Sequence, residues 1–264
     1  MNVETGLLRE QFPYVRVGSG RQPLVVLPGM VLDNRTPSRL VARSYGHGFR
    51  RLADDHTLYI VQHRHGLPGA DMKAMAADYA ELLSELGRVR LMGLSTGGSV
   101  AQHIALDRPD LVERLVLVVS GAYLSPLGRE ICLRWRRLAE HQQWRQLRGE
   151  MAAAAVDGAG VKRVARAFGA LSGKSPTPTD AADFVASVDA DLAHDTRPEL
   201  PGLMVPTMVI GGADDPFFPA PVLHETANAM PRAELRIYPE TGHGLPKRHG
   251  KRLQADVLSF LGSA

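Results

Sequence analysis

Short runs of consecutive apolar residues recur along the chain and alternate with longer segments of helical periodicity. Continuous rather than alternating apolarity is typical of strands that are covered on both faces, as in a parallel sheet. The first run, PLVVLPG, ends in a Pro-Gly stop. Six such runs are predicted to be strands: Pro23–Gly29, His56–His63, Val89–Ser95, Arg114–Gly121, Pro206–Gly212 and Glu234–Glu240.

Helical segments separate these strands. Asp71–Leu86, between the second and third runs, carries apolar residues at helical spacing, and a helix begins again after Ser95 and ends at Pro109. The alternation predicts an α/β fold with a doubly wound, mostly parallel sheet. The segment Tyr14–Gln22 alternates in polarity and is predicted to be an antiparallel edge hairpin that turns at the Gly-Ser-Gly of 18–20.

Residues 122–205 break this pattern, because they contain no convincing strand and suit three or four helices joined by Gly, Ser and Pro-rich turns. So long a connection is usually a functional insertion. We therefore expect a helical lid at 122–205 over a core made of 1–121 and 206–264. The aromatic residues Trp135, Trp144 and Phe168 of this lid are expected in its interior, where the inner face also roofs the substrate pocket.

Composition narrows the function classes. The net charge of +3 is spread along the chain, so no nucleic-acid partner is expected. The lone Cys132 forms no disulfide framework and is expected to be a buried small hydrophobe. No apolar run approaches the roughly 18 residues of a membrane span, and the first residues lack the layout of a secretory signal. The expectation is a cytoplasmic protein without a membrane partner; the oligomeric state is left open.

Candidate chemistry gathers at three strand ends. The third strand ends in GLSTGG, which places Ser95 between Gly93 and Gly97 where a helix begins. This is the context of a nucleophilic serine on a sharp turn, for which the glycines give room. The fifth strand ends in GGADDPFFP with two adjacent aspartates, and the sixth ends in ETGHG with His243. A serine nucleophile needs a histidine base and an acid that orients it, and in open α/β sheets such groups collect at strand ends. The histidines of HRH (63–65) lack matching carboxylate or cysteine ligands, so no metal is expected.

With these motifs the sequence resembles the α/β-hydrolase fold superfamily, in its lid-bearing branch, over nearly the whole chain. GLSTGG resembles the nucleophile elbow, VVLPGM the strand-end loop of the oxyanion hole, VIGGADDPFFP the acid motif and TGHG the histidine loop. The resemblance implies that Ser95 is the nucleophile and His243 the general base. It also implies that the backbone N–H groups of Met30 and Thr96 are the oxyanion donors.

The acid has two candidates. The family pattern Gly-x-x-Asp-x-x-x-Pro selects Asp215 when it is counted from Gly212, with Pro219 in the proline position. Counting from Gly211 selects Asp214 but puts the proline out of register, so Asp215 is preferred. The chain departs from the family pattern in the strand-end loop, where a proline replaces the usual histidine, and after the second strand, where a glutamine replaces an aspartate.

The resemblance implies a serine hydrolase that cleaves a carboxylic ester or lactone through an acyl-enzyme, without a cofactor, on a small-molecule acyl substrate. The same triad serves amidases and peptidases, C–C bond hydrolases and perhydrolases, and the fold alone does not separate these chemistries. A ligand receptor that uses the cleft without turnover is the alternative from another class. Multiple turnover of acyl substrates distinguishes an enzyme from such a receptor.

Overall fold

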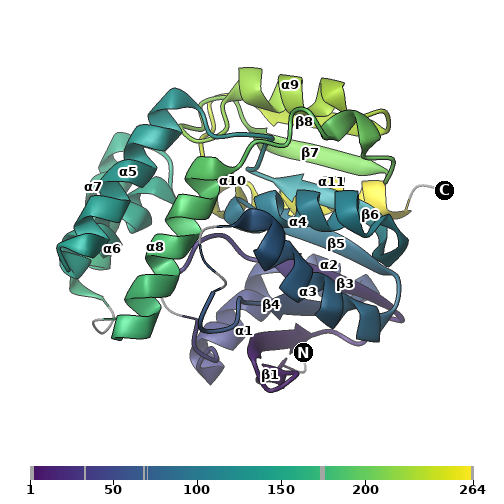
Figure 1. Cartoon of the computed structure of the whole chain (residues 1–264), viewed down its shortest axis with the longest axis horizontal. Coiled ribbons are helices and arrows are strands. Elements are labelled where there is room, and N and C mark those ends of the chain that lie inside the picture. The colour runs from purple at the N-terminus through teal and green to yellow at the C-terminus, as the bar shows by residue number, and fades with distance from the viewer. Residues whose placement is uncertain (1–2, 33, 68, 70, 173–175, 263–264) are drawn as a thin grey trace.

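One mixed sheet organises the molecule (Figure 1). The computed structural model describes residues 3–32, 34–67, 69, 71–172 and 176–262. Within these residues, eight strands lie in the order β1-β2-β4-β3-β5-β6-β7-β8. The six strands from β4 to β8 in this order are parallel, whereas β2 is antiparallel to both of its neighbours, which confirms the doubly wound, mostly parallel sheet. The strands are β1 Val3–Leu8, β2 Phe12–Val17, β3 Gln22–Leu27, β4 His56–Val61, β5 Val89–Leu94, β6 Val112–Val118, β7 Thr207–Gly212 and β8 Ala233–Tyr238.

Helices cover both faces of the sheet, and this explains the continuous apolar runs. Along β3, Val25 and Leu27 pack into the core on one face, while Leu24 and Val26 pack into the core on the other. The first face is covered by α3 (Met72–Leu86), α4 (Thr96–Asp107) and α9 (Ala220–Ala229). The second is covered by α1 (Arg39–Gly48), α2 (Arg50–Asp55) and α11 (Gly250–Gly262). The short helix α10 (Leu245–Arg248) precedes α11.

The edge hairpin differs from the prediction. β2 forms its hairpin with β1, through a turn at Arg9 and Glu10, which both have positive φ. The predicted turn at 18–20 was wrong, because this segment leads from β2 to β3 and β4 lies between those two strands. Gly18 is needed there for another reason: at φ 87°, an added Cβ would lie 2.4 Å from the carbonyl oxygen of His56.

The connection between β6 and β7, which we call the insertion (residues 122–205), contains four α-helices and the 3-10 helix Leu200–Gly202 in its described part. The four α-helices are α5 (Pro126–Glu140), α6 (Trp144–Ala154), α7 (Ala159–Leu171) and α8 (Pro178–Ala193), and they lie together at the left of Figure 1. Trp135, Trp144 and Cys132 are buried as expected. Phe168 is not: its expected interior position was wrong, since it is 75% exposed on α7. None of the described helices combines the length and apolarity needed to cross a membrane.

Candidate active site

Ser95 occupies the turn from β5 into α4 in a strained backbone conformation. Its φ of 51° and ψ of −123° lie in a region that residues with side chains rarely adopt, at a cost on the order of 1–3 kcal/mol. The Ser95 N–H donates to the carbonyl oxygen of Val118 on β6 at 3.0 Å, and its carbonyl accepts the N–H of Gly98 at 2.7 Å. The sheet and the helix together therefore hold the serine in this turn.

The glycines around Ser95 are required by close backbone approaches. A Cβ on Gly93 would lie 2.4 Å from the Cα atom of Gly98, and a Cβ on Gly97 would lie 2.3 Å from the carbonyl oxygen of Leu27. Backbone atoms cannot swing aside as a flexible side chain can. Both positions therefore exclude any residue with a side chain while the turn keeps this shape.

The loop after β3 brings Met30 beside the serine. The loop passes so close that a Cβ on Gly29 would lie 3.2 Å from the Cβ atom of Ser95. Met30 and Thr96, whose amides the family resemblance implies as oxyanion donors, both line one small cavity of about 20 Å³. A cavity of this size holds roughly one water-sized group. This is the topological switch point of the sheet, since β4 and β5 lie on opposite sides of β3.

The acid and the histidine meet at the ends of β7 and β8. The Nδ1 atom of His243 lies 2.7 Å from Oδ2 of Asp215. Oδ1 of Asp215 accepts the backbone N–H groups of Phe217 at 2.8 Å and Phe218 at 3.3 Å, so the buried carboxylate is fixed from both sides. Asp214, by contrast, has an exposed side chain. A carboxylate at Nδ1 favours the tautomer in which Nε2 is free to accept a proton.

The described residues show no hydrogen bond between the Ser95 hydroxyl and the His243 ring. Such contacts are often long in proteins without substrate and tighten in the complex. Aromatic rings border the imidazole instead: Phe217 lies 4.7 Å from the His243 ring centroid, and Trp135 of α5 lies 5.5 Å from Phe217. The histidine loop also touches the insertion, because the Gly242 N–H donates to Asp157 at 3.1 Å. The insertion thus borders the histidine directly.

Helix α8 of the insertion turns a polar stripe toward the core. Asp180, Asp183, Ser187 and Asp191 recur at spacings of three and four residues, and all four side chains are buried. They reach loops that follow three different strands of the sheet. Ser187 lines the small cavity beside the elbow. We call these four residues the α8 polar stripe.

Asp191 contacts the elbow itself. The Thr96 hydroxyl donates to Oδ2 of Asp191 at 2.6 Å, whereas Oδ1 has no hydrogen-bond partner among the described residues. Burial raises the pKa of Asp191 from 3.8 to about 7, and the hydroxyl groups of Thr96 and Ser99 and the nearby His243 limit this rise. Besides Asp215, a buried carboxyl group whose pKa is raised to about 7 therefore adjoins the turn at Ser95.

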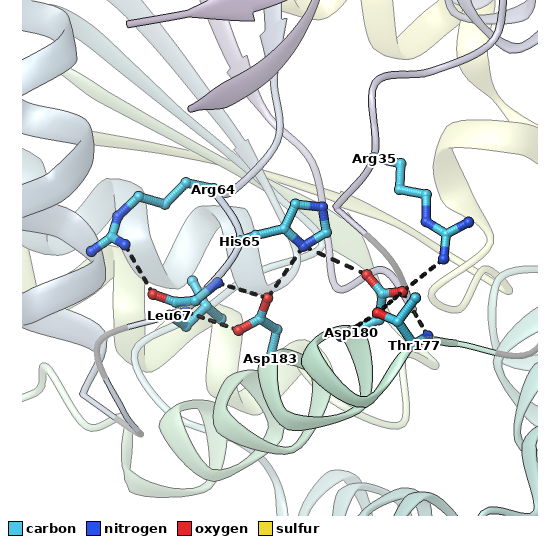
Figure 2. Close-up of polar contacts among 8 residues, drawn as sticks. Arg35, Arg64, His65, Leu67, Thr177, Asp180 and Asp183 are labelled. Atoms are coloured by element: carbon cyan, nitrogen blue, oxygen red, sulfur yellow. Dashed lines mark hydrogen bonds and ion pairs between the residues drawn. The ribbon is translucent and has the colours of Figure 1, made fainter. Parts of the chain in front are cut away.

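The other end of the stripe is anchored to two loops (Figure 2). Oδ1 and Oδ2 of Asp183 accept the backbone N–H groups of Leu67 at 2.8 Å and Gly66 at 3.0 Å. Asp180 forms an ion pair with Arg35 at 3.0 Å and a capping box with Thr177 at the start of α8. Nδ1 of His65 lies 3.6 Å from the carboxylates of Asp180 and Asp183. Burial opposes ionisation of Asp180, but its hydrogen bonds with Thr177 and the charge of Arg35 lower its pKa below the ordinary value. Of the three residues of HRH (63–65), only His65 contacts α8: Arg64 pairs with Asp78 of α3, and the ring of His63 packs on Tyr79.

Sequence reasoning missed the α8 polar stripe and the residues at the end of β4. The stripe was readable in principle, because acidic and hydroxyl residues recur in TDAADFVASVDADL at the spacing of one helix face. At the end of β4, Gln62 and His63 line the small cavity with Met30 and Thr96. Burial lowers the pKa of His63 to about 3, so its ring is neutral at ordinary pH. Its position at a strand end was the available signal.

The fold is that of the α/β hydrolases, and comparison with known proteins agrees with it. The chain matches the Alpha/beta hydrolase family over residues 24–253, and it belongs to that family of enzymes. It is 28% identical over 187 residues to a 2-hydroxy-6-oxononadienedioate/2-hydroxy-6-oxononatrienedioate hydrolase of a Pseudomonas species, covering 68% of this chain and 66% of that protein. It is 29% identical over 199 residues to a pimeloyl-acyl-carrier-protein methyl ester esterase of Nitrosomonas europaea, covering 69% and 77%. The enol-lactonase of Burkholderia xenovorans LB400 shares the fold with a TM-score of 0.77 and 20% identity, over 98% of this chain and 100% of that one.

Proposed function

We propose that the protein hydrolyses a carboxylic ester or lactone through an acyl-enzyme on Ser95. The observation that carries the proposal is the strained serine turn, at φ 51°, at the same edge of the sheet as a His243–Asp215 pair joined at 2.7 Å. Backbone strain of this kind persists where a function needs it. Relatives named as an ester hydrolase and an enol-lactonase support the choice of acyl bond.

In the proposed reaction, the Ser95 hydroxyl attacks the substrate carbonyl and His243 Nε2 accepts its proton. The Met30 and Thr96 amides stabilise the oxyanion of the tetrahedral intermediate. His243 then donates the proton to the leaving alkoxide, which departs as an alcohol and leaves the acyl group on Ser95. His243 then takes a proton from water, which attacks that ester; Ser95 leaves with the proton from His243, and the carboxylic acid is released. Asp215 stabilises the imidazolium in both steps without taking its proton.

We further propose that the insertion acts as a lid. The cavity of about 20 Å³ beside Ser95 is too small for an ester substrate, and α8 holds the elbow and the two neighbouring loops through its polar stripe. A second cavity, of about 960 Å³, lies among α5, α6 and α7 and reaches Trp135 and Pro216, next to the acid. The rings of Trp135 and Phe217 separate this space from His243. Movement of the insertion is therefore proposed to accompany substrate binding.

The proposal is tested with Ser95→Ala, measured by turnover of p-nitrophenyl acetate and by labelling with a fluorophosphonate probe. Loss of a triad member typically lowers kcat by about 10⁴-fold or more, so both signals should vanish. Ser99→Ala is the matched control, because Ser99 is a buried serine one turn further along α4 and should keep its labelling. Equal labelling of wild type and Ser95→Ala would remove Ser95 from the mechanism.

The relatives also favour testing other bonds on the same triad. A panel should pair simple esters with an enol-lactone, an amide and a carbon–carbon substrate of the 2-hydroxy-6-oxo-dienoate class, which the first relative's name describes. Multiple turnovers with the highest kcat/KM on the ester or lactone support the proposal. A single turnover followed by retained product would instead indicate the receptor alternative.

A further inference from the structure

A cavity of about 960 Å³ lies among α5, α6 and α7, three of the helices at the left of Figure 1. Pockets that hold small molecules usually measure roughly 300–1,000 Å³ and are mostly apolar, with a few polar groups that orient the ligand. The apolar lining of this cavity includes Ile131, Trp135, Trp144, Ala154 and Pro216. The proposed hydrolysis assigns no ligand to this space, which we call the insertion cavity.

The charged side chains of the insertion cavity are mostly cationic. Four cations and one anion are among its lining residues: Arg134, Arg145, Lys162, Arg166 and Glu150. The anion is already engaged, because Oε1 of Glu150 accepts hydrogen bonds from Arg134 at 2.6 Å and from Gln146 at 3.1 Å. Arg145, Lys162 and Arg166 form no ion pair with any residue that the structure describes. The cavity therefore carries positive charge that no described residue neutralises.

These three cations reach the cavity from two helices. Arg145 belongs to α6, whereas Lys162 and Arg166 stand four residues apart on one face of α7. Like charges at this spacing repel each other. The two helices cannot easily move apart, because they pack so closely that a Cβ on Gly149 would lie 2.7 Å from the carbonyl oxygen of Arg166. An anion in the cavity would offset the repulsion that this arrangement imposes.

The two tryptophans of the chain both line the insertion cavity, and both are buried. The ring of Trp135 lies 5.5 Å from that of Phe217, and the ring of Phe217 lies 4.7 Å from that of His243. A ligand with an apolar body would gain contact with the large faces of Trp135 and Trp144. It would also touch the aromatic side chains that border the proposed base.

We propose that the insertion cavity binds an organic carboxylate, with its apolar body on Trp135 and Trp144 and its charged end among Arg145, Lys162 and Arg166. A guanidinium group matches the planar geometry of a carboxylate. The mostly apolar lining favours this singly charged group over a phosphate dianion, whose removal from water costs more. The inference goes beyond the proposed function, because such binding needs neither the serine nor turnover.

The test is titration of the wild-type protein with octanoate and with octan-1-ol, which has the same number of carbon atoms but no charge. Tryptophan fluorescence reports binding, because both tryptophans line the cavity, and calorimetry gives the Kd. Octanoate should bind at least about tenfold more tightly than octan-1-ol, since each of the three cations contributes up to about fivefold. Rising salt should weaken only the octanoate complex.

Substitution of single cations locates the carboxylate. Arg166→Gln should weaken octanoate binding about fivefold and leave octan-1-ol binding unchanged. Arg163→Gln is the matched control, because Arg163 is an exposed arginine of the same helix but is not among the residues that line the cavity. It should bind octanoate as the wild type does. Arg145→Gln removes a charge from α6 instead of α7 and should have the same effect as Arg166→Gln.

Several results would overturn the proposal. One is the absence of any fluorescence or heat change at about 10 mM octanoate, and another is equal affinity for octanoate and octan-1-ol. Equal weakening by Arg163→Gln and Arg166→Gln would assign the effect to the overall charge of the insertion. Octanoate bound at the oxyanion hole would be insensitive to both Arg166→Gln and Arg145→Gln. These titrations need no turnover, so they stand even if the proposed hydrolysis fails its own test.

Discussion

Replacing Asp191 by asparagine should make the protein more stable at alkaline pH and nearly leave it unchanged at acidic pH. The amide oxygen of asparagine still accepts the Thr96 hydroxyl, which donates to Asp191 at 2.6 Å in the wild type. What the substitution removes is the ionisation of a buried carboxyl group. The size of the effect therefore follows from how far burial moves the pKa of that group.

The pKa of Asp191 is about 7 in the folded protein and 3.8 in an ordinary environment. Between these values the unfolded chain releases the proton and the folded chain keeps it, so stability falls as pH rises. The contribution of Asp191 to the free energy of unfolding is fully present below pH 3.8, and it is lost once the pH exceeds the pKa of the folded protein. A shift of about three units corresponds to roughly 4 kcal/mol, of which about 3 kcal/mol is lost between pH 5 and pH 8.

The assay is urea unfolding of wild type and Asp191→Asn at several pH values from 5 to 8. Circular dichroism should be followed beside fluorescence, because both tryptophans, Trp135 and Trp144, lie in the insertion and report on it first. Other titrating groups contribute equally to both proteins, so they cancel in the difference of unfolding free energies. That difference should grow with pH in favour of the variant.

A second substitution tests whether the pH dependence of stability comes from the raised pKa of Asp191. Thr96→Val removes the hydrogen bond that favours the charged form of Asp191, so the pH dependence should extend to higher pH. In the Asp191→Asn background, Thr96→Val should leave the pH dependence of stability unchanged. A difference between wild type and Asp191→Asn that stays constant from pH 5 to pH 8 would show that Asp191 titrates normally, and the reasoning from its burial would be refuted.

Two further substitutions test the turn and the acid, each with a partner from the same chain. Gly97→Ala forces a Cβ to 2.3 Å from a carbonyl oxygen and should cost about 1–3 kcal/mol in urea unfolding, whereas Gly160→Ala, with nothing within 4 Å on α7, should be neutral or stabilising. Equal stability of the two variants would contradict the crowding at the turn. Asp215→Asn should lower kcat about 10⁴-fold, while the exposed Asp214→Asn should keep wild-type kinetics. The reverse result would move the acid to Asp214.

Strands buried on both faces were predictable because their signal is local. Each of the six predicted strands is present. Five of them are inner strands, whose apolar runs need cover on both faces, whereas β8 lies at the edge and alternates between exposed and partly buried residues. The strand Val3–Leu8, at the other edge of the sheet, was not predicted, and its residues are likewise partly buried or exposed. Because β4 lies between β2 and β3, β2 forms its hairpin with β1 and not with β3, and this order is visible only in the assembled sheet.

For the candidate site, the sequence located the motif residues but not the side chains that the insertion places around them. Motif spacing located Ser95, the acidic pair and His243, because each follows a strong strand signal. The segment that forms α7 was expected to be helical, but the inward position expected for Phe168 was wrong. Aspartates on a helix usually face water, so the burial of Asp191 was not expected from its residue type.

The α8 polar stripe joins the insertion to the core by contacts of different physical kinds. At one end, Asp183 accepts two backbone N–H groups and Asp180 pairs with Arg35, so charge strengthens the attachment. At the other end, beside the elbow, Asp191 is held by the Thr96 hydroxyl, and burial disfavours its charge. Rising pH through about 7 therefore acts on the contact next to Ser95, while the lowered pKa of Asp180 leaves its distant pair with Arg35 unaffected. Of the two ends of the stripe, the one beside Ser95 is therefore the one that responds to neutral pH.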